Sequence, residues 1–471
     1  MEPGAASVAV HVGRRVDDAT SGASLVLLLA LATAAFGQGA YFSKVQFFIL
    51  CLLGVAVLLA ITAGAVHVAD LRDGLVVAGA LLAVWALIRA WAAGTPGSGT
   101  SWVLFGAGTV AVVLICRHLS ASSRGMLLGG LLAVGVAVAL TGWLGVALHV
   151  GPWGLRSQGL WRAATTLTYT NATAGLLVPL ALVALARLTA TPRAIPLSLA
   201  AMCLLTSTAL TLSRAGAAAL GLGLLVLCWL LGVRRVARAL AVPAVGALVA
   251  VVGLIPSVRA GAPARPEIAV VALAVAVGLV IVAQRLAGWK QLLPVAGVAL
   301  VAAVFVIVLA PQVHRAVRRL LRVRFTLASP ARSGEAAAAI RIIAAHPLAG
   351  MGPGHAILRW TSPGGAVSVD QYVHDEYLQV LTDLGIVGAA LAAVLLVAAG
   401  RLLWRARASS PDRALWAGAV AAAVAFALHS GFDFIWQVPA IPLTVAAIVG
   451  LATCQPSVQR PEPPGKPIPE E

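Results

Sequence analysis

Long apolar segments alternate with short polar connections along most of the chain. Most segments are about 17–25 residues long, which is the length of a membrane-crossing helix, whereas a barrel strand needs about 9–11 residues. The pattern therefore predicts an all-α polytopic membrane protein with about 12–14 transmembrane helices. The expected spans are residues 24–36, 45–66, 74–92, 102–116, 126–146, 172–186, 195–212, 215–231, 239–255, 268–283, 292–310, 378–403, 414–432 and 438–454.

One long polar stretch, residues 311–377, interrupts this pattern and holds four of the nine histidines. It divides the chain into an N-terminal segment (1–21), eleven helices (22–310), the loop itself (311–377), three further helices (378–454) and a Pro-rich tail (455–471) that we expect to be disordered. The first apolar segment also has signal-peptide features, with a small-residue site at Ala32-Thr33-Ala34. Because apolar character continues beyond it, we expect a retained helix.

The charges between the spans predict an orientation. With the N-terminus in the cytoplasm, 18 of the 33 Lys and Arg residues fall in cytoplasmic segments, 7 in the short outer connections and 8 in the long loop. This bias fits the excess of positive charge in cytoplasmic loops, from which long loops are largely exempt. We therefore expect a multi-pass protein of the inner or plasma membrane, with a cytoplasmic tail and an extracytoplasmic loop at 311–377.

Composition limits the class of protein and of partner. The chain is 61% hydrophobic and 10% charged, which is more apolar surface than a soluble protein can bury. Its net charge of +17 would suggest nucleic acid for a soluble domain. Here the arginines recur at membrane edges, so we expect the lipid bilayer and phosphate-bearing substrates as partners, and no nucleic acid.

The start of the long loop carries a basic helical stripe. Arg315, Arg318, Arg319 and Arg322 are spaced i, i+3, i+4 and i+7, which places them on one helical face. Such a helix either rests on anionic lipid headgroups or holds a lipid-linked pyrophosphate, and the two roles are compatible. The candidate substrate-binding arginines of the loop are Arg318, Arg322, Arg324 and Arg341.

Arg214 and His374 are the strongest individual candidates. Arg214 stands between two apolar runs, where it is either an ordinary interfacial arginine or a guanidinium that binds phosphate oxygens. His374 closes the loop at the start of a helix, and either bonds the backbone there or acts as a general base. Tyr377 shares its helical face, and Asp383 lies further along, where a buried acid usually has a partner or a role.

Other site classes have less support. Gly352 and Gly354 lie in AGMGPG, which is either a tight turn or a backbone approach to phosphate. The histidines and acids of the loop match no metal-ligand spacing, and the five cysteines lie in apolar runs without CxxC, so no metal or other cofactor is expected. There is no GxSxG, HExxH or Walker loop.

Five stretches, in this order, resemble motifs of the O-antigen ligase superfamily, which includes O-antigen ligases, polysaccharide polymerases and protein O-oligosaccharyltransferases. They are YTNATAGLLVPL with Asn171, LTLSRAGA with Arg214, the stretch from Arg332 through IRIIAAHPLAGMGPG, HDEYLQVLTDLGIVG with His374, and HSGFDFIWQVP with Asp433. Asp375, Asp383 and Ala215 depart from the residues usual in the family, which are Asn, Glu and Gly. The first five or so spans carry no matching motif.

The resemblance implies a GT-C-like, metal-independent and inverting glycosyltransferase. Its donor would be a polyprenyl-diphosphate-linked glycan and its acceptor a glycan, lipid or protein. His374 would be the base, and Arg214 and Arg332 would stabilise the leaving diphosphate. The substrate-binding positions would include Asn171, Tyr377, Asp383 and Asp433.

Two other functions compete with this hypothesis. A glycan polymerase of the shape, elongation, division and sporulation class has a related many-helix plan, but its motifs are absent. A multi-pass transporter or flippase for a lipid-linked or anionic substrate should carry broken helices, inverted repeats or polar groups at the midplane. The sequence offers mainly Asp383 and shows no internal repeat, so the enzyme is favoured.

Overall fold

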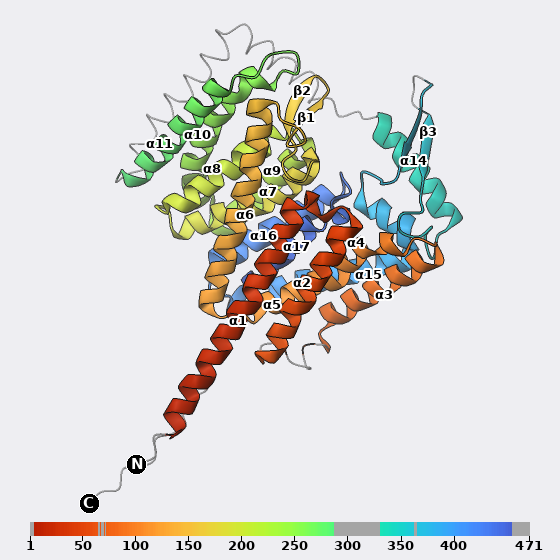
Figure 1. Cartoon of the computed structure of the whole chain (residues 1–471), viewed down its shortest axis with the longest axis horizontal. Helices are drawn as coiled ribbons and strands as arrows, with labels where there is room; N and C mark the ends of the chain where they lie inside the picture. The colour runs from red at the N-terminus through yellow and green to blue at the C-terminus, as the bar shows by residue number, and fades with distance from the viewer. Residues whose placement is uncertain are drawn as a thin grey trace, which may run out of the picture.

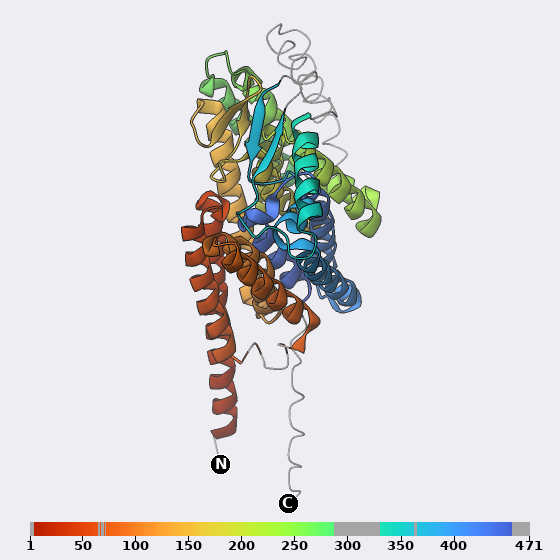
Figure 2. The same cartoon turned by 90° about the vertical axis from the view of Figure 1, so that its right-hand side faces the viewer.

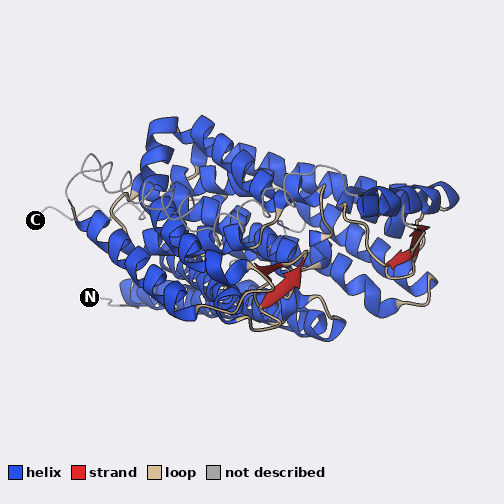
Figure 3. Cartoon of the chain, turned by 90° about the horizontal axis from the view of Figure 1, so that it is seen from above, coloured by secondary structure: helices blue, strands red, loops and turns tan. Residues whose placement is uncertain are grey.

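The computed structural model describes residues 4–64, 66, 70, 72–286, 330–361 and 365–454. Helices make up nearly all of this part of the chain, with two small strand pairs near the molecular surface (Figure 3). The expected span 292–310, the basic stripe with Arg318 and Arg322, and Arg324 lie outside the described residues, as does the C-terminal tail.

The helices follow one another with short connections. They are α1 (Gly4–Phe36), η1 (Gln38–Ala40), α2 (Ser43–Thr62), α3 (Gly74–Ala92), η3 (Pro96–Gly99), α4 (Thr100–Val103), η4 (Leu104–Gly108), α5 (Thr109–Arg117), α6 (Ala121–Leu148), α7 (Thr170–Ala190), α8 (Ile195–Leu210), α9 (Arg214–Leu231), α10 (Val233–Val258), α11 (Pro266–Arg285), α14 (Pro330–Ala345), α15 (Glu376–Ser409), α16 (Arg413–Ser430), η6 (Ile435–Gln437) and α17 (Ala440–Ala452). The strands are β1 (Gly154–Ser157), β2 (Leu160–Ala163), β3 (Leu358–Thr361) and β4 (Val367–Asp370).

The polytopic helical class is confirmed. In the described ranges, 10 helical segments are long and apolar enough to cross a membrane, and three shorter apolar helices accompany them at Thr20–Phe36, Ile195–Leu210 and Ala440–Ala452. Together they coincide with every expected span except 292–310. A bilayer forces this outcome, since a spanning segment must satisfy its own backbone hydrogen bonds.

Helices α7, α16 and α17 form the centre of the bundle. α17 is buried along its whole length, and α7 is buried almost throughout. A helix that is apolar on all sides belongs in the interior, surrounded by other helices. Gly418 of α16 permits close contact with α7, because a Cβ there would lie 3.0 Å from the Cβ of Ala186. Figure 1 shows α16 and α17 behind α1, α2 and α5.

Contacts between helix termini define the two ends of the bundle. At one end, Arg187 near the end of α7 pairs with Asp412 before α16. At the other end, Ala174 in the first turns of α7 packs against Gly216 in the first turn of α9. The start of α15 lies at this same end, because Glu376 accepts the backbone N–H of Trp436, which follows α16. We call this second end the site end.

The glycine turn of the long loop packs into a break in α15. Gly385 has φ 65° and ψ −167°, which interrupts the helix and frees the carbonyls before it. The backbone N–H groups of Met351 and Gly352 donate to Thr382 and Asp383 across 2.8 and 3.0 Å. Gly350 must lack a side chain here, because a Cβ would lie 2.5 Å from the Asp383 carbonyl carbon. The turn therefore anchors the loop to the bundle.

The two strand pairs are antiparallel hairpins. β1 pairs with β2, and β3 pairs with β4, with Leu358 opposite Asp370 in the second pair. α14 packs against β3, where Trp360 covers Gly334. Figures 1 and 2 show β3 beside α14 and away from the projecting start of α1. This small subdomain carries the loop residues toward the site end.

Candidate active site

Asp433 is the centre of a polar cluster at the site end. It follows α16, and its side chain is fully buried. The Tyr169 hydroxyl donates to its two oxygens at 2.7 and 2.9 Å, the Asn171 amide donates to Oδ2, and the Phe434 N–H donates to Oδ1 at 3.0 Å. A buried carboxylate needs such partners. Burial first, and Asp433 second, raise the pKa of Tyr169, so its hydroxyl keeps the proton that it donates.

Arg332 brings the loop to this cluster. It lies in the first turn of α14, and its Nη2 is 3.7 Å from Oδ2 of Asp433. Its side chain is 33% exposed, so the guanidinium is held on one side by Asp433 and remains accessible on the other. A guanidinium with free donors suits a phosphate group.

His374 is held by a carboxylate from the same helix as Arg332. Its Nδ1 lies 2.7 Å from Oε2 of Glu335, whose side chain is 4% exposed, while the His374 side chain is 25% exposed. The ring also meets Phe434 edge-on, with the centroids 5.2 Å apart. The Glu335 carboxylate accepts a hydrogen bond from Nδ1–H, which leaves Nε2 as the proton acceptor of the neutral ring.

The surroundings of His374 raise its pKa. Burial alone would lower it, but the hydrogen bond that His374 donates to Glu335 and the negative charge of Asp433 outweigh burial and the opposing charge of Arg332. The pKa therefore lies above the ordinary value of 6.5. A base with a pKa nearer neutrality accepts a proton more readily, which suits general base catalysis.

Two acidic residues of α15 are buried in the bundle. Glu376 is fully buried and accepts the backbone N–H groups of Trp436 and Gln437. Asp383, 1% exposed, accepts the indole N–H of Trp102 at 3.1 Å. Asp383 therefore lies in the bundle interior, with the Trp102 indole as its hydrogen-bond donor. Asp375, the residue where the family motif usually has Asn, caps α15 through the N–H groups of Tyr377 and Leu378.

The remaining predicted site residues have separate positions. Arg214 begins α9 at the site end and is exposed. Arg341 donates to the Arg359 carbonyl and joins α14 to β3, and Tyr377 donates to the Ala427 carbonyl. Gly352 and Gly354 belong to the anchored turn, where the Gly352 N–H is already bonded. The roles of these residues in substrate binding stay predictions.

Glu335 and Tyr169 were missed by the sequence analysis. Glu335 carried a usable signal, because it is the only acid between residues 311 and 369 and lies one helical turn after Arg332. Tyr169 had no signal of this kind, since a tyrosine before an apolar run is ordinary. Among the described residues, no group of three or more His, Cys, Asp or Glu is arranged to hold a metal ion.

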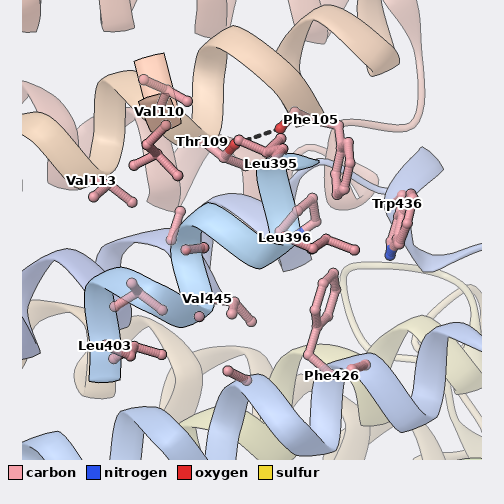
Figure 4. A pocket seen from close by; sticks show the side chains of 18 of the residues that line it. Phe105, Thr109, Val110, Val113, Leu395, Leu396, Leu403, Phe426, Trp436 and Val445 are labelled. Atoms are coloured by element: carbon pink, nitrogen blue, oxygen red, sulfur yellow. Dashed lines mark hydrogen bonds between the residues drawn. The ribbon is translucent and has the colours of Figure 1, made fainter. Parts of the chain in front are cut away.

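An apolar cavity opens in the bundle beside the cluster. Its volume is about 200 Å³. Figure 4 shows the rings of Phe105, Phe426 and Trp436 near one end and Leu403 and Val113 toward the other. Trp436 comes three residues after Asp433, and Tyr377, which also lines the cavity, comes three residues after His374. Two residues that line the cavity therefore follow members of the polar cluster within one helical turn of sequence.

These features define a multi-pass membrane protein with a histidine–carboxylate pair and an arginine at one end of its helices. Residues 267–393 match the family model described as O-Antigen ligase, and this segment is an O-antigen ligase family domain. The resemblance in the sequence is thereby confirmed for the part that contains Arg332 and His374. A domain of this family implies a membrane enzyme of the ligase or polymerase type, with lipid-linked glycan substrates in polysaccharide biosynthesis. A comparison with curated proteins gave no match.

Proposed function

We propose that the protein is an inverting, metal-independent glycosyltransferase that uses a polyprenyl-diphosphate-linked glycan at the extracytoplasmic face. The observation that carries this proposal is the convergence of His374–Glu335 and Arg332–Asp433 at one end of the bundle. This convergence brings His374 as a base and Arg332 as a cation for phosphate to the same end of the bundle. The apolar cavity beside them supports a donor whose carrier is a long apolar chain.

The proposed reaction is one displacement. An acceptor hydroxyl oxygen attacks the anomeric carbon of the donor, and a new glycosidic bond forms as the bond to the diphosphate oxygen breaks. Nε2 of His374 takes the hydroxyl proton, and Glu335 stabilises the resulting imidazolium. The diphosphate leaves with the electron pair, and Arg332 stabilises its charge together with Arg214. Attack from the face opposite the leaving group inverts the anomeric centre.

The function is tested by deleting the gene and analysing the lipid-linked glycans. We expect unused donor to accumulate, because its transfer is the proposed step. Accumulated single repeats identify a polymerase, and accumulated long chains identify a ligase. A normal pool of lipid-linked glycans together with unchanged envelope glycans would contradict the proposal.

Glu335→Gln tests the pairing with His374. Only the neutral imidazole acts as a base, so the rate should rise with pH through a His374 pKa above 6.5. Removing the Glu335 charge removes a cause of that increase, so the rising limb should move to lower pH. The maximal rate should also fall about 10- to 100-fold, because the ring loses its orienting partner.

The measurement is a pH–rate profile of glycan transfer for purified protein in liposomes. Glu267→Gln is the matched control, since Glu267 is an exposed carboxylate paired with Arg265. An unshifted profile in Glu335→Gln would show that Glu335 does not set the proton affinity of the base.

The orientation of the site end is part of the proposal. The positive-charge bias supports an extracytoplasmic loop, and the Arg187–Asp412 pair marks the opposite end. A reporter enzyme that works only outside the cytoplasm, inserted at Gly365 between β3 and β4, should be active. Activity of a cytoplasm-specific reporter at the same position would reverse the orientation and refute the extracytoplasmic reaction.

A further inference from the structure

A second pocket is lined by two residues of the Asp433 cluster, Tyr169 and Phe434. Its volume is about 220 Å³. Three connections form it: the one from α1 to α2, the one from β2 to α7, and the one from α16 to α17. Its lining residues are Gln38, Tyr41, Phe42, Leu167, Thr168, Tyr169, Phe434 and Val438.

The pocket is contiguous with the catalytic cluster through two of its walls. Tyr169 donates its hydroxyl to Asp433, and Phe434 contacts the ring of His374. Phe434 also stacks on Tyr169 and on Tyr372, with centroids 5.3 and 5.2 Å apart. A molecule in the pocket would therefore lie directly beside the proposed base and the Asp433–Arg332 pair.

The wall from the α1–α2 connection is held firmly in place. Gly39 has φ 71°, and a Cβ there would lie 2.4 Å from Val438, so only glycine fits between the two walls. The buried amide of Gln46 donates to the carbonyls of Ala40 and Tyr41 at 2.9 and 3.1 Å. This turn therefore presents the Tyr41 side chain from a fixed backbone.

The backbone around the pocket is also strained. Gln38 and Ala40 have φ values of 55° and 59°, and Thr168 has 57°, although none of them is glycine. Such left-handed residues cost free energy and persist where the surrounding structure holds them, often at binding sites. The surrounding structure therefore maintains the backbone of the pocket, which differs from the regular backbone of the helices.

The chemistry of the lining fits a sugar ring. Tyr41, Phe42, Tyr169 and Phe434 supply aromatic surface, and the amide of Gln38 and the hydroxyl of Thr168 supply hydrogen-bonding groups. A pyranose has apolar C–H faces and a polar rim of hydroxyls, so it needs both kinds of contact. The cavity of Figure 4, in contrast, is lined almost entirely by apolar side chains and suits a hydrocarbon chain.

We propose that this aromatic pocket binds a pyranose ring of the glycan substrate next to the reacting centre. The inference rests on the proposed function, because that function places a glycan beside His374. The ring comes from either the donor or the acceptor, since both carry the same chemistry. Six of the eight lining residues precede position 170, and all eight lie outside the segment that matches the O-antigen ligase model, so this pocket would set glycan preference independently of that domain.

Tyr41→Ala is the test, with Tyr41→Phe as its matched control. The substrates are polyprenyl-diphosphate-linked oligosaccharide extracted from cells that lack the protein, and the acceptor identified with the wild-type enzyme. Tyr41→Ala should raise the KM of one glycan substrate about five- to tenfold and leave kcat within about twofold of the wild type. Tyr41→Phe keeps the ring and should stay near the wild type. A raised donor KM places the donor sugar in the pocket, and a raised acceptor KM places the acceptor there.

Binding of polyprenyl diphosphate without a glycan separates a sugar site from a lipid site. Its affinity should be the same in wild type and Tyr41→Ala. Weaker binding of this glycan-free lipid in the variant would overturn the proposal. Gln38→Ala, at an exposed position, is a second variant that should raise the same KM if Tyr41→Ala does not fold. Unchanged KM values for both substrates in the folded variants would also overturn it, whereas a wild-type protein without transfer activity would instead refute the proposed function.

Discussion

Replacing His374 with alanine is expected to lower the rate of glycan transfer about 10²- to 10⁴-fold and to leave the amount of protein in the membrane unchanged. The expectation follows from its position, because its Nδ1 bonds Glu335 and its ring lies against Phe434 in the Asp433 cluster. A general base contributes about 10²- to 10⁴-fold, and the neighbouring carboxylates of Glu335 and Asp433 are buried. The measurement is transfer from the lipid-linked donor by purified protein, and analysis of lipid-linked glycans in cells.

His355→Ala is the control for this substitution. His355 belongs to the same loop but is exposed and lies in the anchored turn, so its loss should leave transfer near the wild-type rate. Normal product glycan in His374→Ala cells would remove His374 from the role of base. An equal loss of activity in His355→Ala would indicate that the loop fold, not the imidazole, had been tested.

Arg332→Ala is expected to reduce kcat about 10²- to 10³-fold, because the leaving diphosphate loses a preorganised cation. The buried Asp433 should tolerate this change, since it keeps the Tyr169 hydroxyl, the Asn171 amide and the Phe434 N–H as donors. The thermal unfolding temperature should therefore move little. Arg332→Lys should recover part of the rate, because it restores the charge without the planar pair of donors.

Arg341→Ala is the matched control for Arg332. Both arginines lie on α14, but Arg341 is exposed and bonds the Arg359 carbonyl. Its loss should have a much smaller effect on kcat. The assignment of Arg332 would be wrong if Arg332→Ala kept the wild-type kcat, or if its activity fell only in proportion to a loss of folded protein.

Much of the fold was predictable because the bilayer leaves few alternatives. A 17- to 25-residue apolar run must become a helix there, so the expected spans within the described residues each coincide with one helical segment. The loop was visible for the same reason, since a long polar stretch cannot lie in lipid. His374 and Arg332 stood out by their residue types at motif positions.

The partners of these residues were not predictable from local pattern. Asp433 and Tyr169 are 264 residues apart, and only the packing of α7 against α16 brings them together. The same holds for the glycine turn, whose N–H groups bond carbonyls freed at Gly385, a break that the apolar pattern of α15 does not reveal. Tyr41 lay in a part of the chain without any motif, yet it lines a pocket beside the cluster.

The sequence alone determined that this is a polytopic helical membrane protein with its polar chemistry concentrated between residues 311 and 377, because hydrophobic length and residue type act locally. Only the tertiary structure decided which groups meet. Glu335 lies against His374 and Arg332 against Asp433, while Tyr169 bonds Asp433 and Phe434 contacts His374. These pairings depend on how buried helices pack against one another, and that packing is a property of many distant residues at once. The polar loop is therefore one half of the site, and the ends of α7 and α16 supply the other half.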